Sequence, residues 1–297
     1  MKKFIILSLL SIGHVWGATV NELTLHFIPS PHGMDWSTPS TLAKSALINR
    51  ISFKPRFIGH VFVELKCAET HELTGMVGKH FDYFNQLLVQ QKGLGILYHS
   101  FQGKLETKEE ILPELTRFQE EGYSNFVTFK ISSPQCERAI SYLKEYKENN
   151  YGKFYGLSNR PRFGEGAGCS AFGASFMDVL NLIDDDIKNS WSQTVKIPLA
   201  FAGPPLNKDG VNILKIMLNA GSWAKDGEPF QELLFWDPDK MHTWVKNKVQ
   251  SKDANMTVIK NKNAQGVIID RSRVPLPLEP IWLKEGTADA KTSLIVP

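Results

Sequence analysis

The feature that most constrains the fold is a glycine-rich turn that leads directly into an apolar helix. The segment GEGAGCSAFGASFMDVLNL spans residues 164–182 and places three glycines in the five residues before Cys169. Apolar side chains at positions 172, 176, 179, 180 and 183 share one stripe of the expected helix. Cys169 falls on the same stripe, so we expect its thiol to face the layer on which the helix packs.

Cys169 has a chemical and a structural interpretation. A helix N-terminus lowers the pKa of a thiol, because the unpaired N–H groups and the helix dipole favour the thiolate. Free cysteines are also commonly buried, so a small core residue is the alternative. The turn lacks the Lys-Ser/Thr of a phosphate-binding loop, and Phe172 breaks the G-x-S-x-G pattern, which argues against Ser170 as a nucleophile.

A nucleophilic cysteine needs a base, and histidine is the usual one. The histidines after residue 18 are His26, His32, His60, His71, His80, His99 and His242. His60 stands out because it follows Gly59 at the start of a strongly apolar strand, on the same face as Phe62. A histidine there is equally compatible with a hydrogen-bonded core residue.

The rest of the chain mixes strand and helix patterns, which indicates an α+β protein. We expect strands at residues 22–28, 57–67, 72–78, 93–101 and 125–131. We expect helices at residues 41–51, 81–91, 108–122 and, after a serine cap, 132–150. Thr38 is the expected N-cap of the first of these helices, with Pro39 at its first position.

The N-terminus predicts a secretory signal at residues 1–17. A basic MKK precedes the apolar FIILSLLSIGHVW, and Val15 and Gly17 suit the −3 and −1 positions of a cleavage site before Ala18. An uncleaved anchor is the alternative, although the apolar run is short for a membrane span. Removing Lys2 and Lys3 would reduce the net charge from +3 to +1, and no cluster of basic residues indicates nucleic-acid binding.

The three cysteines and the tryptophans suggest the further organisation. In an oxidising compartment Cys67 and Cys136 are the natural pair if Cys169 is a working thiol, and three free thiols are the alternative. Five of the seven tryptophans follow residue 190. We therefore expect a core at residues 18–189 and a Trp/Pro-rich extension or subdomain at residues 190–297, in which the tryptophans form either core or a carbohydrate- or lipid-binding platform.

Two motifs and their order carry a resemblance to a known superfamily. GHVFVEL (59–65) precedes, by about a hundred residues, a helix followed by YGLSNRPRFGEGAGCSAF (155–172). This order resembles the circularly permuted branch of the NlpC-like, papain-like hydrolases, which includes the lecithin:retinol acyltransferase-like proteins. The resemblance covers roughly residues 57–183 and implies a permuted papain-like core, with an antiparallel sheet packed on the helix that begins at the cysteine.

The resemblance implies a thiol hydrolase or acyl-transfer site without a cofactor. Cys169 would attack a carbonyl and form a thioester, while His60 would take the thiol proton and later protonate the leaving group. The backbone N–H of Cys169 would help to bind the oxyanion. No close-spaced pair of histidines indicates a metal site.

A third polar residue usually orients the histidine, and here several candidates remain. His80 would lie opposite His60 if the hairpin turn centred on Thr70, and it is the preferred candidate. His71 has nearly the spacing of the acyltransferase branch. Glu64 shares a face with His60 but lies roughly 13 Å along the strand, and His99 lies on a later expected strand.

Tyr155, Asn159 and Gly168 are the expected substrate-binding residues, because they lead into the cysteine. Residues 160, 162 and 165 are charged and either bind substrate or form ion pairs. The expected function is a secreted or periplasmic Cys–His hydrolase of amide bonds, with peptide or peptidoglycan as substrate. A lipid ester hydrolase or acyltransferase with the same chemistry, and a non-catalytic envelope binding module, are the alternatives.

Overall fold

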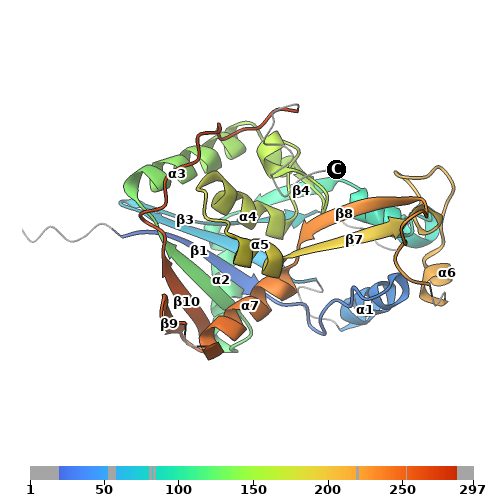
Figure 1. Cartoon of the computed structure of the whole chain (residues 1–297), viewed down its shortest axis with the longest axis horizontal. Helices are drawn as coiled ribbons and strands as arrows, with labels where there is room; N and C mark the ends of the chain where they lie inside the picture. Colours follow the sequence, from blue (N-terminus) through green and yellow to red (C-terminus); the bar gives the residue numbers. More distant parts are fainter. Residues whose placement is uncertain are drawn as a thin grey trace, which may run out of the picture.

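The structure is a computed structural model that describes residues 20–52, 58–79, 82, 85–218, 221–251 and 253–285. It is an α+β protein with a large mixed sheet, a small antiparallel sheet and flanking helices (Figure 1). None of the helices in these ranges is long and apolar enough to cross a membrane.

The large sheet has eight strands in the order β6-β4-β3-β2-β1-β5-β10-β9. Neighbouring strands are antiparallel except for β5 and β10, which are parallel, so the expected antiparallel sheet is present within a mixed one. The bounds are β1 (Asn21–Ile28), β2 (His60–Cys67), β3 (Thr70–Gly78), β4 (Phe101–Glu106), β5 (Asn125–Lys130), β6 (Phe154–Tyr155), β9 (Met256–Asn261) and β10 (Ala264–Asp270).

Helices cover both faces of this sheet. The larger core joins one face to α3 (Ser133–Glu148), α4 (Cys169–Val179), α5 (Asp185–Trp191) and α7 (Pro238–Ser251). The opposite face packs on α2 (Lys108–Glu120), which continues through Pro113 as expected. The alternation of β1 and β2 explains this division, because Val61 and its alternate neighbours face α4, whereas Phe62 faces α2.

The small sheet lies to one side of the large one and has its own core (Figure 1). It pairs β7 (Ser192–Pro198) with β8 (Phe230–Trp236) and packs with α1 (Pro39–Ile51) and α6 (Ile213–Leu218). Thr38 caps α1 through a capping box, as expected. The chain after residue 190 thus contributes both to the small sheet and, through α7, β9 and β10, to the large one.

Two expected elements differ from the structure. Residues 93–101 were expected as a strand, but Leu94–Tyr98 forms a 3₁₀ helix and β4 begins only at Phe101. A short apolar run does not distinguish strand from helix, and these side chains pack into the core of the small sheet. Within the expected helix 81–91, Asn85–Val89 forms a π-helical turn, and positions 81, 83 and 84 lie outside the described ranges.

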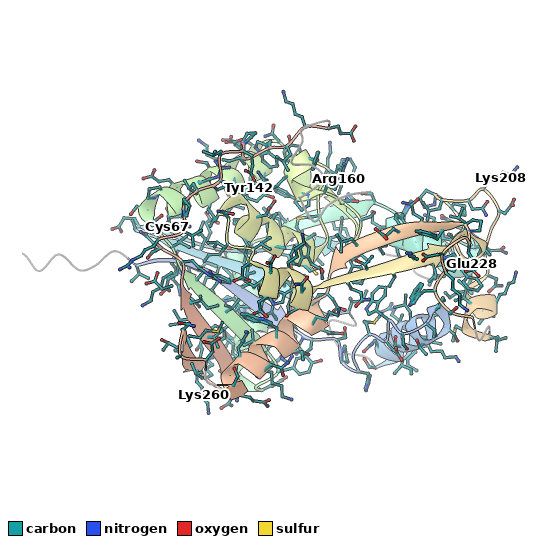
Figure 2. The ribbon with its side chains drawn as sticks, in the orientation of Figure 1. Cys67, Tyr142, Arg160, Lys208, Glu228 and Lys260 are labelled. Carbon is teal, nitrogen blue, oxygen red and sulfur yellow. A yellow bond between two sulfur atoms is a disulfide. The ribbon has the colours of Figure 1, made fainter. Side chains whose placement is uncertain are left out.

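The disulfide links Cys67 to Cys136, with a Cα–Cα distance of 5.7 Å, and leaves Cys169 as a free cysteine. Cys67 ends β2, far from the small sheet (Figure 2). At about 3.3 Å per residue, it lies roughly 23 Å from His60 at the other end of the strand. The disulfide therefore fastens α3 to the sheet at a distance from the free thiol.

The five tryptophans after residue 190 do not form a surface platform. The large core contains Trp191, Trp236 and Trp244, while Trp223 and Trp282 pack partly against a core.

Candidate active site

Cys169 is the first residue of α4, as the glycine-rich turn predicts. Gly166 has a φ of +81°, and a side chain there would collide with the Phe154 carbonyl, so the turn depends on glycine. Gly168 then occupies the N-cap in an extended conformation. The Cys169 side chain is buried, and its Sγ lies 3.7 Å from the carbonyl oxygen of Gly59.

The thiol lies at the end of β2 where β3 no longer pairs with it. Strands β2 and β3 pair only from Phe62 and Gly75 towards their hairpin, whereas β3 continues beyond Gly75 as the partner of β4. His60 and Val61 therefore have no partner on β3. This end of β2 pairs with β1 alone. The N-terminus of α4 reaches it, and His60, the Val61 backbone and Tyr155 all interact there with the Cys169 thiol.

These contacts favour the thiolate. Burial raises the pKa of the Cys169 thiol, but the charge of His60, hydrogen bonds from His60 and Tyr155, and the Val61 backbone together lower it below its ordinary value of 9.0. A buried thiol with a lowered pKa beside an imidazole is the arrangement expected of a cysteine nucleophile and its base. The structure thus brings together the two residues that the sequence singled out.

Glu106 is the polar residue that orients His60. The Nε2 atom of His60 and the Oε2 atom of Glu106 are 3.0 Å apart, and both residues are buried. The Phe62 ring packs edge-to-face with the His60 imidazole, with ring centroids 4.6 Å apart. Because Nε2 is engaged by the carboxylate, Nδ1 is the ring atom left for the thiol.

Gly75 makes the contact between Glu106 and His60 geometrically feasible. It lies between Phe62 on β2 and Glu106 on β4 in one row across the sheet. A Cβ atom at Gly75 would lie 3.0 Å from both the Glu106 carboxylate and the Phe62 ring. Glu106 is not among the residues expected from the sequence, and the one signal for it is a glutamate that ends a strand opposite a glycine.

The residues proposed as third partners have other roles or lie outside the structure. His80 lies outside the described residues, and the hairpin turn is at Ala68 and Glu69 rather than centred on Thr70. The premise that set His80 opposite His60 was therefore wrong. Glu64 accepts hydrogen bonds from His26 and His71, and His99 precedes β4 instead of lying on a strand.

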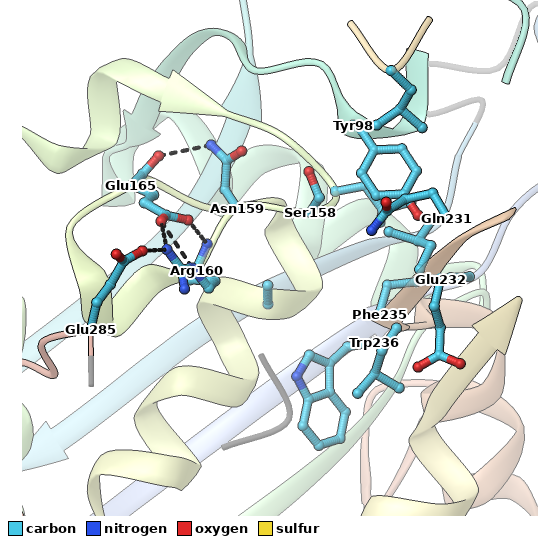
Figure 3. A pocket seen from close by; sticks show the side chains of 15 residues that line it. Tyr98, Ser158, Asn159, Arg160, Glu165, Gln231, Glu232, Phe235, Trp236 and Glu285 are labelled. Atoms are coloured by element: carbon cyan, nitrogen blue, oxygen red, sulfur yellow. Dashed lines mark hydrogen bonds and ion pairs between the residues drawn. The ribbon is translucent and has the colours of Figure 1, made fainter. Parts of the chain in front are cut away.

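The expected substrate-binding residues line the approach to α4. Tyr155 contacts the thiol, while the Asn159 side chain donates to the Ser100 hydroxyl and the Glu165 carbonyl at 3.0 and 2.8 Å. Arg160 is paired with Glu165 and Glu285 (Figure 3). The buried Arg162 binds Asp178 and the backbone carbonyls of residues 280 and 281, so it has a structural role.

A cavity of about 370 Å³ lies beside the first turn of α4 (Figure 3). Ala171, two residues after the cysteine, lines it together with the loop at residues 157–160 and strand β8. Its wall combines apolar side chains with carboxylates that include Glu232. Within the described ranges, no group of histidine, cysteine and carboxylate side chains could hold a metal ion.

A hydrogen-bonded chain fixes the backbone that faces the thiol. The Ser30 hydroxyl accepts from the Gly59 N–H at 2.9 Å, and the Asp239 carboxylate accepts from the Ser30 N–H at 2.6 Å. The neighbouring Asp237 caps α7, and burial together with the charge of Asp239 raises its pKa to about 6. The Gly59 carbonyl is therefore held in place by residues from the start of α7.

Comparison with known proteins gives no relative for this chain. No family model, no curated protein and no solved structure matches it. The chemistry of the site is therefore the basis for assigning a function.

Proposed function

We propose that this protein is a cysteine hydrolase that cleaves amide bonds through a thioester intermediate. The single observation that carries the proposal is the buried set of Cys169, His60 and Glu106, in which the imidazole lowers the pKa of the thiol and a carboxylate holds the imidazole. The chain order, with the histidine strand before the cysteine helix, supports a permuted papain-like core related to the NlpC-like hydrolases.

The chemistry follows from the positions of these groups. The Cys169 thiolate attacks the carbonyl carbon, and the N–H groups at the start of α4 donate hydrogen bonds to the developing oxyanion. His60, protonated by the thiol, donates its proton to the leaving amine as the C–N bond breaks. It then takes a proton from water, which attacks the thioester and releases the acid and the thiol. Glu106 stabilises the imidazolium throughout.

The compartment belongs to the same proposal. Residues 1–17 have the pattern of a cleavable secretory signal, and the Cys67–Cys136 disulfide suits an oxidising compartment. A secreted or periplasmic amidase would meet peptides and peptidoglycan, which are the substrates we favour. A lipid ester hydrolase or acyltransferase would use the same three residues on a different acyl group.

The burial of the site favours a second candidate function. Cys169 and His60 are only 5% and 3% exposed, so a non-catalytic envelope module with an inert thiol is the competing proposal. Such a module would keep the fold and the disulfide but would form no acyl-enzyme. The two proposals therefore differ in whether the thiol reacts.

Labelling with a thiol-directed hydrolase probe tests the proposal. We expect Cys169→Ala and His60→Ala each to abolish labelling while circular dichroism shows the native fold. His71→Ala is the matched control, because His71 is a half-exposed histidine bound to Glu64, and it should label normally. Mass spectrometry of the enzyme mixed with peptide amides or with lipid esters would show which acyl group is retained. A wild-type protein that neither labels nor acylates would support the binding module.

A further inference from the structure

Lys92 is a buried side chain whose ammonium has no counter-ion among the residues that the structure describes. The residue is 5% exposed, and its ammonium makes no hydrogen bond or ion pair with any residue that the structure describes. Its one polar contact is with the face of Phe101, whose ring centroid lies 5.9 Å from Nζ. A lysine that buries its stem usually keeps its ammonium beside a counter-charge or in solvent.

The backbone around Lys92 is held tightly, so the fold fixes where its side chain begins. The Lys92 carbonyl accepts hydrogen bonds from the N–H groups of Gly95 and Gly203, both at 2.9 Å. Lys92 also forms a parallel bridge with Val211, and Gly93 forms an antiparallel bridge with Ala202. These contacts clamp the segment against the loop that precedes α6.

His99 adds a second nitrogen donor at the same place. Its ring packs edge-on against Phe101, with centroids 4.5 Å apart. Lys92 and His99 therefore contact the same Phe101 ring. Burial, and then the charge of Lys92, lower the pKa of His99 below its ordinary value. No carboxylate among the described residues pairs with either group. Lys92 therefore supplies a positive charge that no described carboxylate compensates, and His99 supplies a neutral N–H donor beside it.

The side chains of Lys92 and His99 border the thiol. Phe101 is the antiparallel partner of Tyr155 across β4 and β6, so their side chains lie next to each other on the α4 face of the sheet, about 5 Å apart at Cβ. Tyr155 in turn contacts the Cys169 thiol. Lys92 and Cys169 are thus separated by one pair of aromatic side chains.

We propose that Lys92 and His99 form an oxyanion-binding subsite that takes a carboxylate or phosphate group of the substrate close to the bond that Cys169 attacks. This inference rests on the proposed function, because it assigns the subsite to the substrate of that thiol. A bound anion would neutralise the ammonium and accept a hydrogen bond from the imidazole. The acyl substrate would then be an acidic one.

The first test compares two alkylating reagents at Cys169, the cysteine that is not part of the disulfide. Iodoacetate carries a negative charge and iodoacetamide does not, so the ratio of their rates reports the local potential. We expect Lys92→Met to lower the iodoacetate-to-iodoacetamide ratio by about tenfold with little change in the iodoacetamide rate. Lys153→Met is the matched control, since Lys153 also lies over a phenylalanine ring but is exposed, and it should leave the ratio unchanged.

The second test measures anion binding directly and does not depend on the reactivity of the thiol. Glutarate and inorganic phosphate, at constant ionic strength, should each raise the Tm of the wild type by a few degrees, because a ligand that binds the folded state stabilises it. The larger shift identifies the preferred anion. Lys92→Met should fold well, since methionine keeps the buried apolar stem, and should lose the shift.

The outcomes separate this inference from the proposed function. Slow alkylation by both reagents, no faster than a free thiol, would overturn the hydrolase proposal, and the anion-dependent Tm shift would still decide whether the subsite exists. An unchanged shift in Lys92→Met would overturn the subsite. If Lys92→Met loses the Tm shift but keeps the iodoacetate-to-iodoacetamide ratio, the subsite exists but does not lie beside the thiol.

Discussion

Two buried histidine–carboxylate pairs lie on the same face of the large sheet, and only one of them meets a thiol. His60 and Glu106 are 3.0 Å apart, and His26 and Glu64 are 3.1 Å apart. Both histidines are 3% exposed. By distance and burial alone the two pairs are nearly the same.

The surroundings of the two pairs differ. Glu64 also accepts from His71 at 2.7 Å and pairs with Lys66 at 3.0 Å, so several donors share its carboxylate. The Nδ1 atom of His26 is buried and has no hydrogen-bond partner among the described residues. At the other pair, the imidazole of His60 also meets Cys169 at a helix N-terminus. A histidine–carboxylate pair alone therefore does not indicate an active site. The candidate active site differs from the structural ion pair because a helix places a thiol beside its histidine.

The largest expected difference is between His60→Ala and His26→Ala. Loss of His60 removes the base and the charge that lowers the pKa of the thiol, so the second-order rate of iodoacetamide labelling at pH 7 should fall about 10²–10³-fold. His26→Ala should leave that rate within about twofold and instead lower the free energy of unfolding by about 1–3 kcal/mol, because Glu64 loses a partner. Labelling kinetics and urea unfolding measure the two effects. Equal losses of labelling in both variants would contradict the distinction.

The sequence allowed Cys169 and His60 to be singled out because each lies at the start of an element with a strong pattern of its own. The glycine turn and the apolar stripe fix where α4 begins, and the alternation in β2 fixes which face His60 takes. The capping residues of α1 and α3 are similarly local signals. Local patterns of this kind can be interpreted from the sequence because they do not depend on residues far away in the chain.

Glu106 could not be predicted in the same way, because its role depends on the order and register of strands. It lies 46 residues after His60 and reaches it across the row formed by Phe62 and Gly75. A small displacement of the expected hairpin turn, from Ala68 and Glu69 to Thr70, was enough to favour His80 instead. The prediction of a strand at 93–101 was wrong for a related reason, because these residues pack into the core of the small sheet, which forms from distant parts of the chain.

An intermediate difference is expected between Glu106→Gln and Glu64→Gln. Glutamine keeps the shape of Glu106 but removes the charge that stabilises the imidazolium, so labelling at pH 7 should slow about tenfold. The pH–rate profile should also move to higher pH, a shift that a merely structural role would not produce. Glu64→Gln should leave the profile in place and cost about 1–3 kcal/mol of stability. An unmoved profile in Glu106→Gln would exclude it as the residue that orients His60.

The smallest expected difference is between the wild type and Glu64→Gln, in how far the free energy of unfolding falls at acid pH. Burial raises the pKa of Glu64, but the hydrogen bond and charge of His26, followed by those of Lys66, outweigh burial and hold the pKa well below its ordinary value of 4.5. A carboxylate whose pKa is lower in the folded than in the unfolded state contributes stability that is present above the unfolded pKa and is lost as the pH falls towards the folded one. The wild type should therefore lose about 1–2 kcal/mol more than Glu64→Gln between pH 6 and pH 3.

Urea unfolding at a series of pH values measures this slope. Glu72→Gln is the control, because Glu72 forms an exposed pair with Lys147 that solvent screens, and its slope should match that of the wild type. Parallel slopes for the wild type and Glu64→Gln would mean that Glu64 is no more strongly held in the folded chain than in the unfolded one. The His26 pair would then differ from the His60 pair in strength as well as in position. A steeper slope in the wild type alone would establish that the His26–Glu64 pair stabilises the sheet while the His60–Glu106 pair serves the thiol.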